Sequence, residues 1–397
     1  MSESRLPENP PIAAGDILVG RYRVERILGV GGMGVVVAAT QLDLERRVAI
    51  KILLPSALES SGARERFARE GRALSRLTTE HVTRVLEVGE LESGLPFLVM
   101  ELLEGRDLAA LLVERGTFDV ATVAHLVTQA CAGLADAHRN GIIHRDLKPS
   151  NLFVAVSPGG SSSLKVLDFG ISKELGPQKK VVTCDSEVLG SPLYMSPEQL
   201  CSTRSLDPRS DIWSLGIVMY ELLVGCVPFD GDSFTEICAR ILHAPTPRLD
   251  DVRLDVPKAF ADVVARCLAK DRKKRFADVS ELAGALAPFA KAALDRSRTT
   301  ARTRRVLQRP SAMRMVAGVL GAASLAGLLS IALQEDGTLP TRAQHRAEVV
   351  TVKSAFIVTS ADTVPERAVD VLIDAKAPVP RRAMVHASRP SEPDLGY

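Results

Sequence analysis

One short stretch decides how this chain is interpreted: residues 144–151 read His-Arg-Asp-Leu-Lys-Pro-Ser-Asn. In such a loop the carboxylate of Asp146 can orient a hydroxyl group and finally accept its proton. Lys148 can neutralise negative charge on a phosphoryl group in transit, and the amide of Asn151 can hold Mg²⁺. His144 is interpreted as a structural hydrogen-bonding residue rather than as a base or a metal ligand. Eight such residues in this order rarely occur by chance.

A second acidic motif follows the first. Residues 164–167 form a strand-like run, and Asp-Phe-Gly at residues 168–170 comes directly after it. An aspartate at a strand end beside a glycine can reach a metal, because Mg²⁺ prefers carboxylate and phosphate oxygens. Alone this tripeptide is too common to mean much, but Asp168 lies twenty-two residues after Asp146, which makes it specific. We therefore expect Asp168 to join Asn151 as a metal ligand.

A glycine-rich stretch lies near the start of the chain, between two strand-like runs. Glycines without side chains let a backbone hairpin approach phosphate oxygens, and a valine after them offers an apolar surface to a base. A dinucleotide-binding loop has the same spelling, but there a helix follows the glycines, whereas residues 35–38 read as a strand. The residues expected to line a phosphate-covering flap are Leu28, Gly29, Val30, Gly31, Gly32, Met33, Gly34 and Val36.

A lysine closes the strand that follows this flap. Lys51 comes seventeen residues after Gly34, and strand alternation points Ala49 and Lys51 to the same face. A lysine on an inward face costs stability unless it is paired or bound to phosphate. Lys51 therefore needs a carboxylate partner.

The helix expected over residues 63–77 supplies that partner. At about 100° per residue, Glu70 falls inside the apolar stripe marked by Phe67, whereas Glu65 falls on the opposite face. We expect an ion pair between Glu70 and Lys51, and interpret Glu65 as a solvated surface residue.

In this order, the motifs resemble those of the protein kinase superfamily, specifically the eukaryotic-like serine/threonine kinases of bacteria. The resemblance covers roughly residues 20–289. It implies transfer of the γ-phosphate of ATP, with Mg²⁺, to serine or threonine hydroxyls of proteins. Lys148 in the catalytic loop resembles the serine/threonine branch rather than the tyrosine branch. Met100 would be the gatekeeper beside the adenine pocket, and residues 101–103 the hinge that binds adenine.

Carried over residue by residue, the resemblance assigns roles to the motifs. The implied catalytic residues are Asp146, Lys148, Lys51 and Glu70, and the implied metal ligands are Asn151 and Asp168. The nucleotide site would be completed by Ala49, Lys51, Met100, Glu101 and Leu103.

Further markers lie downstream. Residues 190–198 resemble the substrate-docking segment, residues 211–216 resemble the helix that supports the catalytic loop, and Arg275 resembles the arginine that pairs with Glu198. Ser191 and Ser196 replace the usual threonine and alanine, and residues 157–163 lengthen a hairpin with turn-forming residues. We expect the protein to be active despite these three departures.

Arg145, directly before Asp146, resembles the arginine of kinases that are activated by phosphorylation of the activation loop. In such kinases arginines gather around the new phosphate. The candidate acceptors between Gly170 and Ser196 are Thr183, Ser186 and Ser191, and we expect autophosphorylation of Thr183 or Ser186.

The apolar periodicity predicts an α+β, bilobal fold with a cleft between the lobes. Strand-like runs at 22–28, 35–39, 47–53, 85–90 and 97–100, with one helix at 63–77, predict a small β-rich lobe. Helical spacing at 122–138, 212–223, 235–242 and 259–269 predicts a larger helical lobe. The expected organisation is a mobile leader at 1–20; a kinase domain at 21–289, with N-lobe 21–100, hinge 101–103 and C-lobe 104–289; a basic juxtamembrane linker at 290–314; a transmembrane helix at 315–333; and an extracytoplasmic tail or small β module at 334–397.

Composition adds few constraints. The 397 residues are 46% hydrophobic and 25% charged, which is ordinary for a globular protein, and the net charge of +2 predicts no nucleic-acid partner. The six cysteines show no C-x-x-C spacing, so we expect small, mostly buried apolar residues in a reducing compartment. The N-terminal residues lack the apolar run of a signal peptide.

Residues 315–333 are nineteen consecutive uncharged residues. A helix of that length spans about 28 Å, close to the ~30 Å hydrocarbon core of a bilayer. A buried soluble helix is the alternative, because glycines and alanines make the segment less apolar than a leucine-rich span. Apolar residues all round and arginines on one side only favour a single-pass membrane span with residues 1–314 in the cytoplasm. Small residues at 318, 322 and 326 fit either a homodimer contact or simple spacing.

Two rival interpretations remain open. A pseudokinase would bind nucleotide without transferring phosphate, but it usually lacks the lysine or one of the aspartates, and Lys51, Asp146 and Asp168 are all present. In a receptor, residues 335–397 would sense a signal and the kinase would report it. The tail shows two strand-like runs, at 349–359 and 368–373, and is either a small β module or disordered.

Overall fold

The computed structural model describes residues 12–31, 34–58, 62–157, 159–169, 192–201 and 207–291. The expected membrane span at 315–333, the tail after it, and nearly all of the basic linker lie outside the described residues. So do Gly32, Met33 and the candidate phosphorylation sites Thr183, Ser186 and Ser191. Within the described ranges, no helix is both long enough and apolar enough to cross a bilayer.

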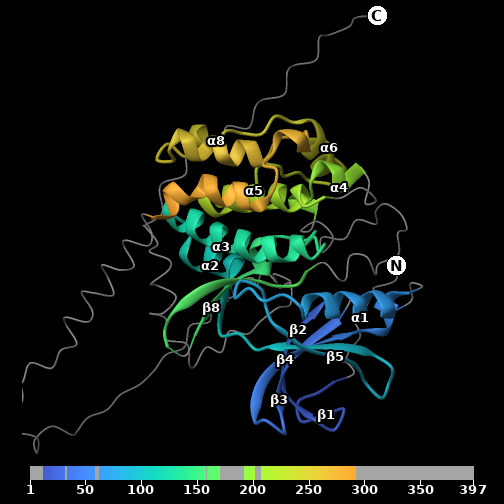
Figure 1. The fold of residues 1–397 in the computed structure, drawn as a ribbon. Coiled ribbons are helices and arrows are strands. Elements are labelled where there is room, and N and C mark those ends of the chain that lie inside the picture. Colours follow the sequence, from blue (N-terminus) through green and yellow to red (C-terminus); the bar gives the residue numbers. More distant parts are fainter. Residues whose placement is uncertain are drawn as a thin grey trace, which may run out of the picture.

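The N-lobe is an antiparallel sheet with one helix packed against it, at the lower end of the molecule in Figure 1. Burial alternates at the start of β2, where Tyr22 and Val24 are buried and Arg23 is exposed, whereas β3, β4 and β6 are buried on both faces over most of their length. The predicted strands and the predicted helix are confirmed, with small differences at their ends. In the order β1-β2-β3-β4-β6-β5, the strands are β1 (Ile17–Leu18), β2 (Tyr22–Gly31), β3 (Gly34–Gln41), β4 (Arg46–Leu53), β6 (Pro96–Glu101) and β5 (Val85–Glu90), and the helix is α1 (Ala63–Leu74).

The ordered sheet begins earlier in the chain than expected. The sequence places residues 1–20 in a mobile leader, yet Ile12 is buried and Ile17 pairs with Arg23 across the β1–β2 ladder. Ile12 and Leu18 pack in the same apolar cluster as Val24. The signal was too short to detect from sequence, because a two-residue strand has no measurable period.

Helix α1 lies unusually close to the sheet. Phe67 and Leu74 are buried on the face of α1 that meets the sheet, and Gly71 lies between them. A Cβ atom on Gly71 would lie 2.5 Å from Leu98 Cδ2 and 3.1 Å from Val88 Cγ2. A larger residue at position 71 would therefore displace the helix, β6 or the buried Leu98 side chain.

The C-lobe is mainly helical, and a small sheet borders it on the side of the N-lobe (Figure 1). Two of its helices begin directly after aspartate caps: Asp107 accepts from the N–H of Ala110, and Asp119 accepts from the N–H of Ala121. The helices are α2 (Leu108–Arg115), α3 (Val120–Arg139), α4 (Pro197–Cys201), α5 (Arg209–Val224), α6 (Phe234–His243), α7 (Leu249–Val252), α8 (Lys258–Cys267) and a last helical segment at 279–291, and the sheet holds β7 (Gly105–Asp107), β8 (Leu152–Val156) and β9 (Ser162–Val166).

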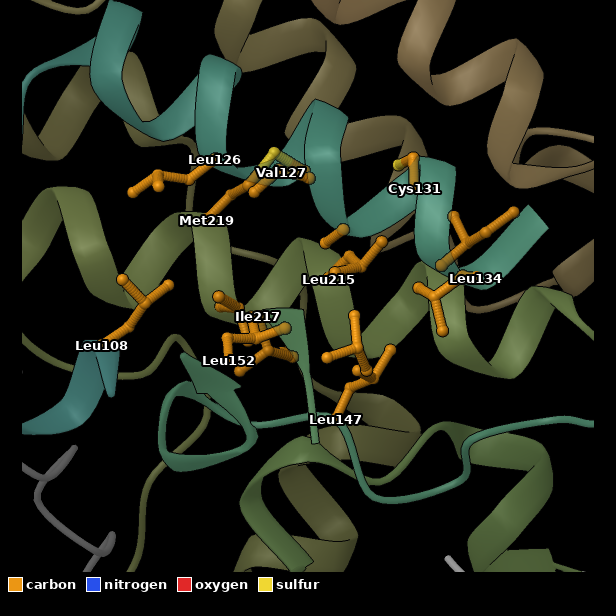
Figure 2. Close-up of a cluster of buried hydrophobic side chains, with 14 of the residues drawn as sticks. Leu108, Leu126, Val127, Cys131, Leu134, Leu147, Leu152, Leu215, Ile217 and Met219 are labelled. Carbon is orange, nitrogen blue, oxygen red and sulfur yellow. The ribbon is translucent and has the colours of Figure 1, made fainter. Parts of the chain in front are cut away.

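Helix α5 is the centre of the C-lobe core. It is buried along nearly its whole length, and its Trp213 stacks on Phe229 with ring centroids 5.8 Å apart. Figure 2 shows Met219 of α5 beside Leu126 and Val127 of α3, and Ile217 of α5 beside Leu152 of β8. Leu147, on the loop before β8, is fully buried in the same apolar cluster. A helix that is apolar on all faces is expected in such a central position. The loop that carries Asp146 thus rests directly on the core.

The cysteines differ in part from the expectation. Cys131 and Cys267 are buried, as expected of small apolar residues, but Cys201 and Cys226 are exposed and Cys238 is intermediate. Sequence alone does not predict whether a single small residue at the end of a helix is buried, which explains the difference for Cys201.

Candidate active site

The catalytic loop is held in place by one buried carboxylate on α5. Asp211 accepts the backbone N–H groups of His144 and Arg145, both at 2.9 Å, and the ring of His138 lies 2.8 Å away. Burial alone would raise the pKa of Asp211, but His138 and the other hydrogen-bond donors lower it below its ordinary value. The ionised carboxylate therefore fixes the backbone of the loop just before Asp146.

Residues His144 and Phe169 join this loop to the segment after β9. The His144 ring lies 4.7 Å from the ring of Phe169, and its Nε2 bonds the carbonyl oxygen of Leu167 at 2.7 Å. His144 is fully buried, which confirms its interpretation as a structural hydrogen-bonding residue. Arg145 adopts φ +65, a conformation that costs energy in a residue with a side chain and that Asp211 helps to maintain.

Three of the sequence-predicted site residues meet in this loop. Asn151 donates from Nδ2 to the backbone oxygen of Asp146 at 2.7 Å and to its Oδ2 at 3.3 Å. Lys148 Nζ lies 3.5 Å from the same Oδ2. The Asp146 side chain is about one-fifth exposed, so it can meet a hydroxyl group from outside.

Asp168 and Lys51 face each other across the cleft. Lys51 Nζ lies 2.9 Å from Asp168 Oδ1, and the exposed fractions of the two side chains are 7% and 13%. The other oxygen, Asp168 Oδ2, is buried and has no hydrogen-bond partner among the described residues. A buried carboxylate oxygen without a donor fits a site that a cation completes.

The ion pair expected between Lys51 and Glu70 is not formed in this structure. Among the described residues, the carboxylate that contacts Lys51 is that of Asp168. Glu70 is half-buried on α1, where burial raises its pKa and the positive charges of Arg69, Arg145 and Arg66 oppose that increase. The helical period predicts the face of α1 on which Glu70 lies. It does not predict the distance of α1 from β4 or the position of the competing arginines, because these depend on the tertiary structure.

A small cavity opens behind the Lys51–Asp168 pair. Strand register sets its wall, since Lys51 lies opposite Val36 on β3 and Ala49 lies opposite Met100 on β6. Val36 and Ala49 are buried, as a surface for a base requires. The cavity is lined by Lys51, Leu74, Val82, Thr83, Val85, Leu98, Met100, Val166, Asp168 and Phe169.

The glycine-rich flap closes the N-lobe side of this region. Gly29 pairs with Val36 and Gly31 with Gly34 across the β2–β3 hairpin. A Cβ atom on Gly34 would lie 2.6 Å from the backbone oxygen of Ile52, so this glycine is required by strand packing as well as by any phosphate. Leu28 is partly buried and Val30 is exposed.

Sequence reasoning missed an apolar cluster beside the expected hinge. Leu103 of the hinge is buried in an apolar cluster with Phe153, Ala155 and Leu167. Phe153 and Ala155 alternate on β8, and Leu167 directly precedes Asp168, so strand alternation after Asn151 was the available signal.

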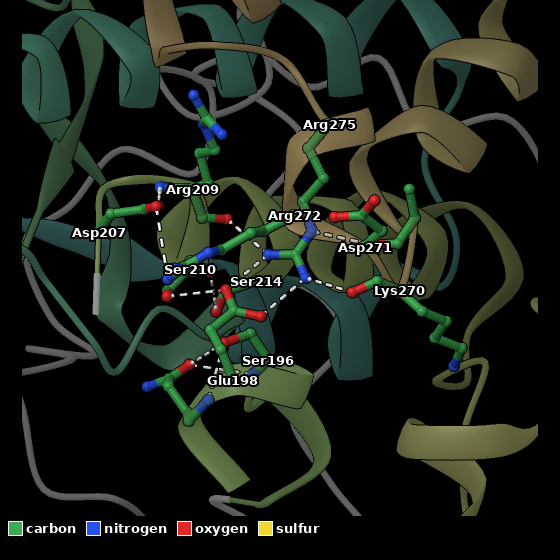
Figure 3. Close-up of polar contacts among 12 residues, drawn as sticks. Ser196, Glu198, Asp207, Arg209, Ser210, Ser214, Lys270, Asp271, Arg272 and Arg275 are labelled. Carbon is green, nitrogen blue, oxygen red and sulfur yellow. Dashed lines mark hydrogen bonds and ion pairs between the residues drawn. The ribbon is translucent and has the colours of Figure 1, made fainter. Parts of the chain in front are cut away.

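On the far side of the catalytic loop, the expected pair of Glu198 and Arg275 is confirmed. Arg275 Nη1 and Nη2 lie 2.7 Å and 2.8 Å from the two carboxylate oxygens of Glu198. Figure 3 shows this pair surrounded by Ser210, which donates to Glu198, and by Arg209, whose backbone oxygen accepts from Arg275. Gln199 on α4 donates to the backbone oxygen of Arg145 at 3.0 Å. The described part of the docking segment is thus attached to the catalytic loop.

A β-rich lobe and a helical lobe, with a lysine, two aspartates and an asparagine gathered between them, define a bilobal domain of the protein kinase type. The chain belongs to the protein kinase family, since the family model described as protein kinase domain matches residues 22–285.

Serine/threonine-protein kinase pkn3 of Myxococcus xanthus is 37% identical over 270 residues, which cover 66% of this chain and 48% of that protein. Serine/threonine-protein kinase PknL of Mycobacterium tuberculosis is 36% identical over 262 residues, or 66% of this chain and 64% of that one. The crystal structure of the Mycobacterium tuberculosis PknI kinase domain superimposes with a TM-score of 0.56 at 27% identity, covering 70% of this chain and all of that one. The chain thus spans from about half to about two-thirds of the length of these two curated relatives.

Proposed function

We propose that this chain is a serine/threonine protein kinase that transfers the γ-phosphate of ATP to hydroxyl groups of cytoplasmic proteins. The observation that carries the proposal is the grouping of Asp146, Lys148 and Asn151 on one loop, facing the Lys51–Asp168 pair. The names of the relatives, which are serine/threonine-protein kinases, support the same choice of acceptor.

The residues present fit ATP and Mg²⁺. Asp168 offers a buried oxygen without a donor, and Asn151 turns its amide nitrogen to Asp146, which leaves the amide oxygen as its metal-binding group. Lys51 is a buried cation that would bind phosphate oxygens. When bound, ATP would supply the phosphoryl group and Mg²⁺ would neutralise its charge.

The chain's own residues would then perform the remaining steps. Asp146 is within reach of Lys148 and Asn151 and partly exposed, so its carboxylate can orient the substrate hydroxyl and accept its proton. Lys148 would stabilise the negative charge of the phosphoryl group as it moves. Leu103 and its buried apolar neighbours would exclude water from one face of the base.

The test is transfer of radiolabel from ATP to a generic serine/threonine substrate with Mg²⁺, using the full chain in detergent micelles. We expect Lys51→Met and Asp146→Asn to lower transfer by about a hundredfold or more, because each removes a group that acts in the transition state. Lys273→Met, at an exposed position on the C-lobe, is the matched control. Transfer that survives both site substitutions would refute the mechanism, and binding of ATP without transfer would favour the pseudokinase alternative.

Regulation by autophosphorylation of the activation loop is part of the proposal. Arg145 and Arg66 act electrostatically on Glu70 in this structure. A phosphate on Thr183 or Ser186 would attract the same arginines, and Glu70 would then be available to Lys51. Mass spectrometry of active protein should find one of these sites occupied, and treatment with a phosphatase should lower activity. Active protein with both sites empty would contradict this step.

Membrane attachment through residues 315–333 is likewise proposed, on the strength of their uncharged sequence and of the arginines before them. The kinase domain would then act on substrates near the inner face of the membrane, and residues 334–397 would lie outside, where they could sense a signal. The full chain should stay with membranes in high salt, whereas a chain ending at residue 310 should be released. Release of the full chain by salt alone would show that the segment does not span. Cross-linking in membranes would test the homodimer.

A further inference from the structure

An ion pair behind the hinge links the two lobes at a point that no catalytic motif covers. Lys165 on β9 places its Nζ 2.7 Å from Glu101 Oε1, at the end of β6. The exposed fractions of the two side chains are 14% and 31%, so the pair is largely shielded from water. A charge-assisted hydrogen bond in such a setting is stronger than a pair at the open surface.

The carboxylate of Glu101 has a second partner. The backbone N–H of Arg84 donates to the same Oε1 at 2.8 Å, and the N–H of Glu101 donates back to the carbonyl oxygen of Arg84 at 3.0 Å. Glu101 is therefore held by its backbone and by its side chain at once. A side chain tied in this way has little freedom to let the chain after it shift.

Residues 81–84, which hold Glu101 through Arg84, are themselves attached to the C-lobe. Thr83 donates its N–H to the carbonyl oxygen of Val166, and Val166 donates to the carbonyl oxygen of His81. Gly133 on α3 lies so close to His81 that a Cβ atom on it would be 2.6 Å from the His81 carbonyl oxygen. Lys165 is the neighbour of Val166 on β9, so one short strand end carries both connections.

These contacts define what Lys165 can control. Glu101 and Leu103 belong to the hinge, and Leu103 lies in the apolar cluster with Leu167, two residues beyond Lys165. We propose that Lys165 is a positioning residue for ATP: through Glu101 it fixes the hinge backbone relative to the apolar pocket in which adenine would lie. The inference rests on the proposed function, because it assumes that the hinge binds adenine.

The alternative is a purely structural pair whose loss would lower stability without changing nucleotide affinity. The two roles separate in binding measurements, since a positioning residue changes the dissociation constant and KM for ATP more than kcat. They also separate in a double-mutant cycle, because a residue that acts through Glu101 loses its effect once Glu101 cannot hold the charge.

The experiment uses the full chain in detergent micelles and titrates it with a fluorescent ATP analogue, alongside steady-state transfer at varied ATP. We expect Lys165→Met to raise the dissociation constant and KM for ATP about tenfold, the equivalent of one lost charge-assisted hydrogen bond, with kcat within about twofold. Lys165→Arg keeps the ion pair and should bind ATP like the unmodified protein. Adding Glu101→Gln to Lys165→Met should cause little further loss, and Lys273→Met should have no effect.

Each outcome has a distinct meaning. Unchanged ATP affinity in Lys165→Met, or independent and additive effects of the two substitutions, would overturn the inference while leaving the kinase proposal intact. Failure of the unmodified protein to bind ATP would instead overturn the proposed function. If Lys165→Met loses its cooperative thermal transition, Lys165→Gln and Glu101→Gln replace it, and equal affinity to the unmodified protein in both would again overturn the role of Lys165.

Discussion

Lys51 Nζ and Asp168 Oδ1 lie 2.9 Å apart, so a strand of the N-lobe is tied directly to the segment that leaves β9. Both residues were expected in the site, but as binders of phosphate and metal rather than of each other. In this structure the lysine neutralises the carboxylate that a metal would otherwise occupy. We expect nucleotide binding to exchange this contact for others, with Glu70, the half-buried carboxylate on α1, as the new partner of Lys51.

The first prediction concerns Glu70. Because burial raises its pKa and it forms no ion pair with Lys51 here, its charge adds no stability from that contact. Glu70→Gln should leave the melting temperature unchanged or raise it, while lowering kcat at least tenfold if the pair forms only during catalysis. Calorimetry and radiolabel transfer measure the two quantities. Glu65→Gln, at an exposed position of the same helix, should change neither. A clear loss of stability in Glu70→Gln would show that Glu70 already holds a stabilising contact.

The second prediction tests the approach of α1 to the sheet. Gly71→Ala would place a methyl group 2.5 Å from Leu98 Cδ2, so overpacking of about 1–3 kcal/mol should outweigh the roughly 1 kcal/mol gained from helix propensity. Gly284→Ala is the matched control, because Gly284 is also helical and a Cβ there meets nothing within 4 Å. Calorimetry should show a lower melting temperature for Gly71→Ala and an equal or higher one for Gly284→Ala. Equal gains in both would mean that the helix moves away without cost.

The third prediction concerns the buried pair of Glu198 and Arg275. Removing one partner of such a pair leaves the other charge uncompensated, so Arg275→Ala should lower the free energy of unfolding by about 3–5 kcal/mol. Urea unfolding followed by the fluorescence of Trp213, the single tryptophan, measures it. Lys273→Ala, at an exposed neighbouring position, should have little effect.

The same pair gives a pH dependence with a defined sign. Burial alone would raise the pKa of Glu198, but hydrogen bonds and charge from Arg275 and a bond from Ser210 lower it below its ordinary value of 4.5. A depressed pKa means that the stabilisation is complete above 4.5 and is lost as the pH falls through the folded-state pKa. The difference in unfolding free energy between the unmodified protein and Glu198→Gln should therefore shrink as the pH falls below about 4.5. A difference that grows there would contradict the assignment.

The fourth prediction uses the cysteines. Burial raises the pKa of Cys131 to about 12 and also raises that of Cys267, so neither forms a thiolate at neutral pH. A thiol-reactive reagent should modify Cys201 and Cys226 in the folded protein, and Cys131 and Cys267 only after unfolding. Peptide mass spectrometry identifies the modified positions. Early modification of Cys267 would show that the C-lobe core opens without global unfolding.

The sequence predicts some elements of the site better than others. The strand that carries Ala49 and Lys51, and the helix that carries Glu70, follow from local periodicity, which is why they lie where the sequence predicts them. The contact of Lys51 with Asp168 was not expected, because two carboxylates were available and the choice between them depends on the distance of α1 from β4. The apolar cluster around Phe153 was missed, since a single aromatic residue in a strand does not indicate which cavity it faces.

The burial of helix α5 bears on how fast nearby amide hydrogens exchange with solvent, a process that takes minutes to hours. Its Asp211 binds the amide hydrogens of His144 and Arg145, and the helix itself is buried along nearly its whole length. We expect those two amides to exchange with solvent only when the most protected part of the C-lobe opens. We therefore expect the backbone before Asp146 to belong to the last unit of the domain to unfold, and α1, which contacts β5 and β6 of the sheet, to shift at lower free energy. The loop that carries Asp146 thus lies on the side of the cleft expected to be more rigid, and Glu70 on the side expected to adjust.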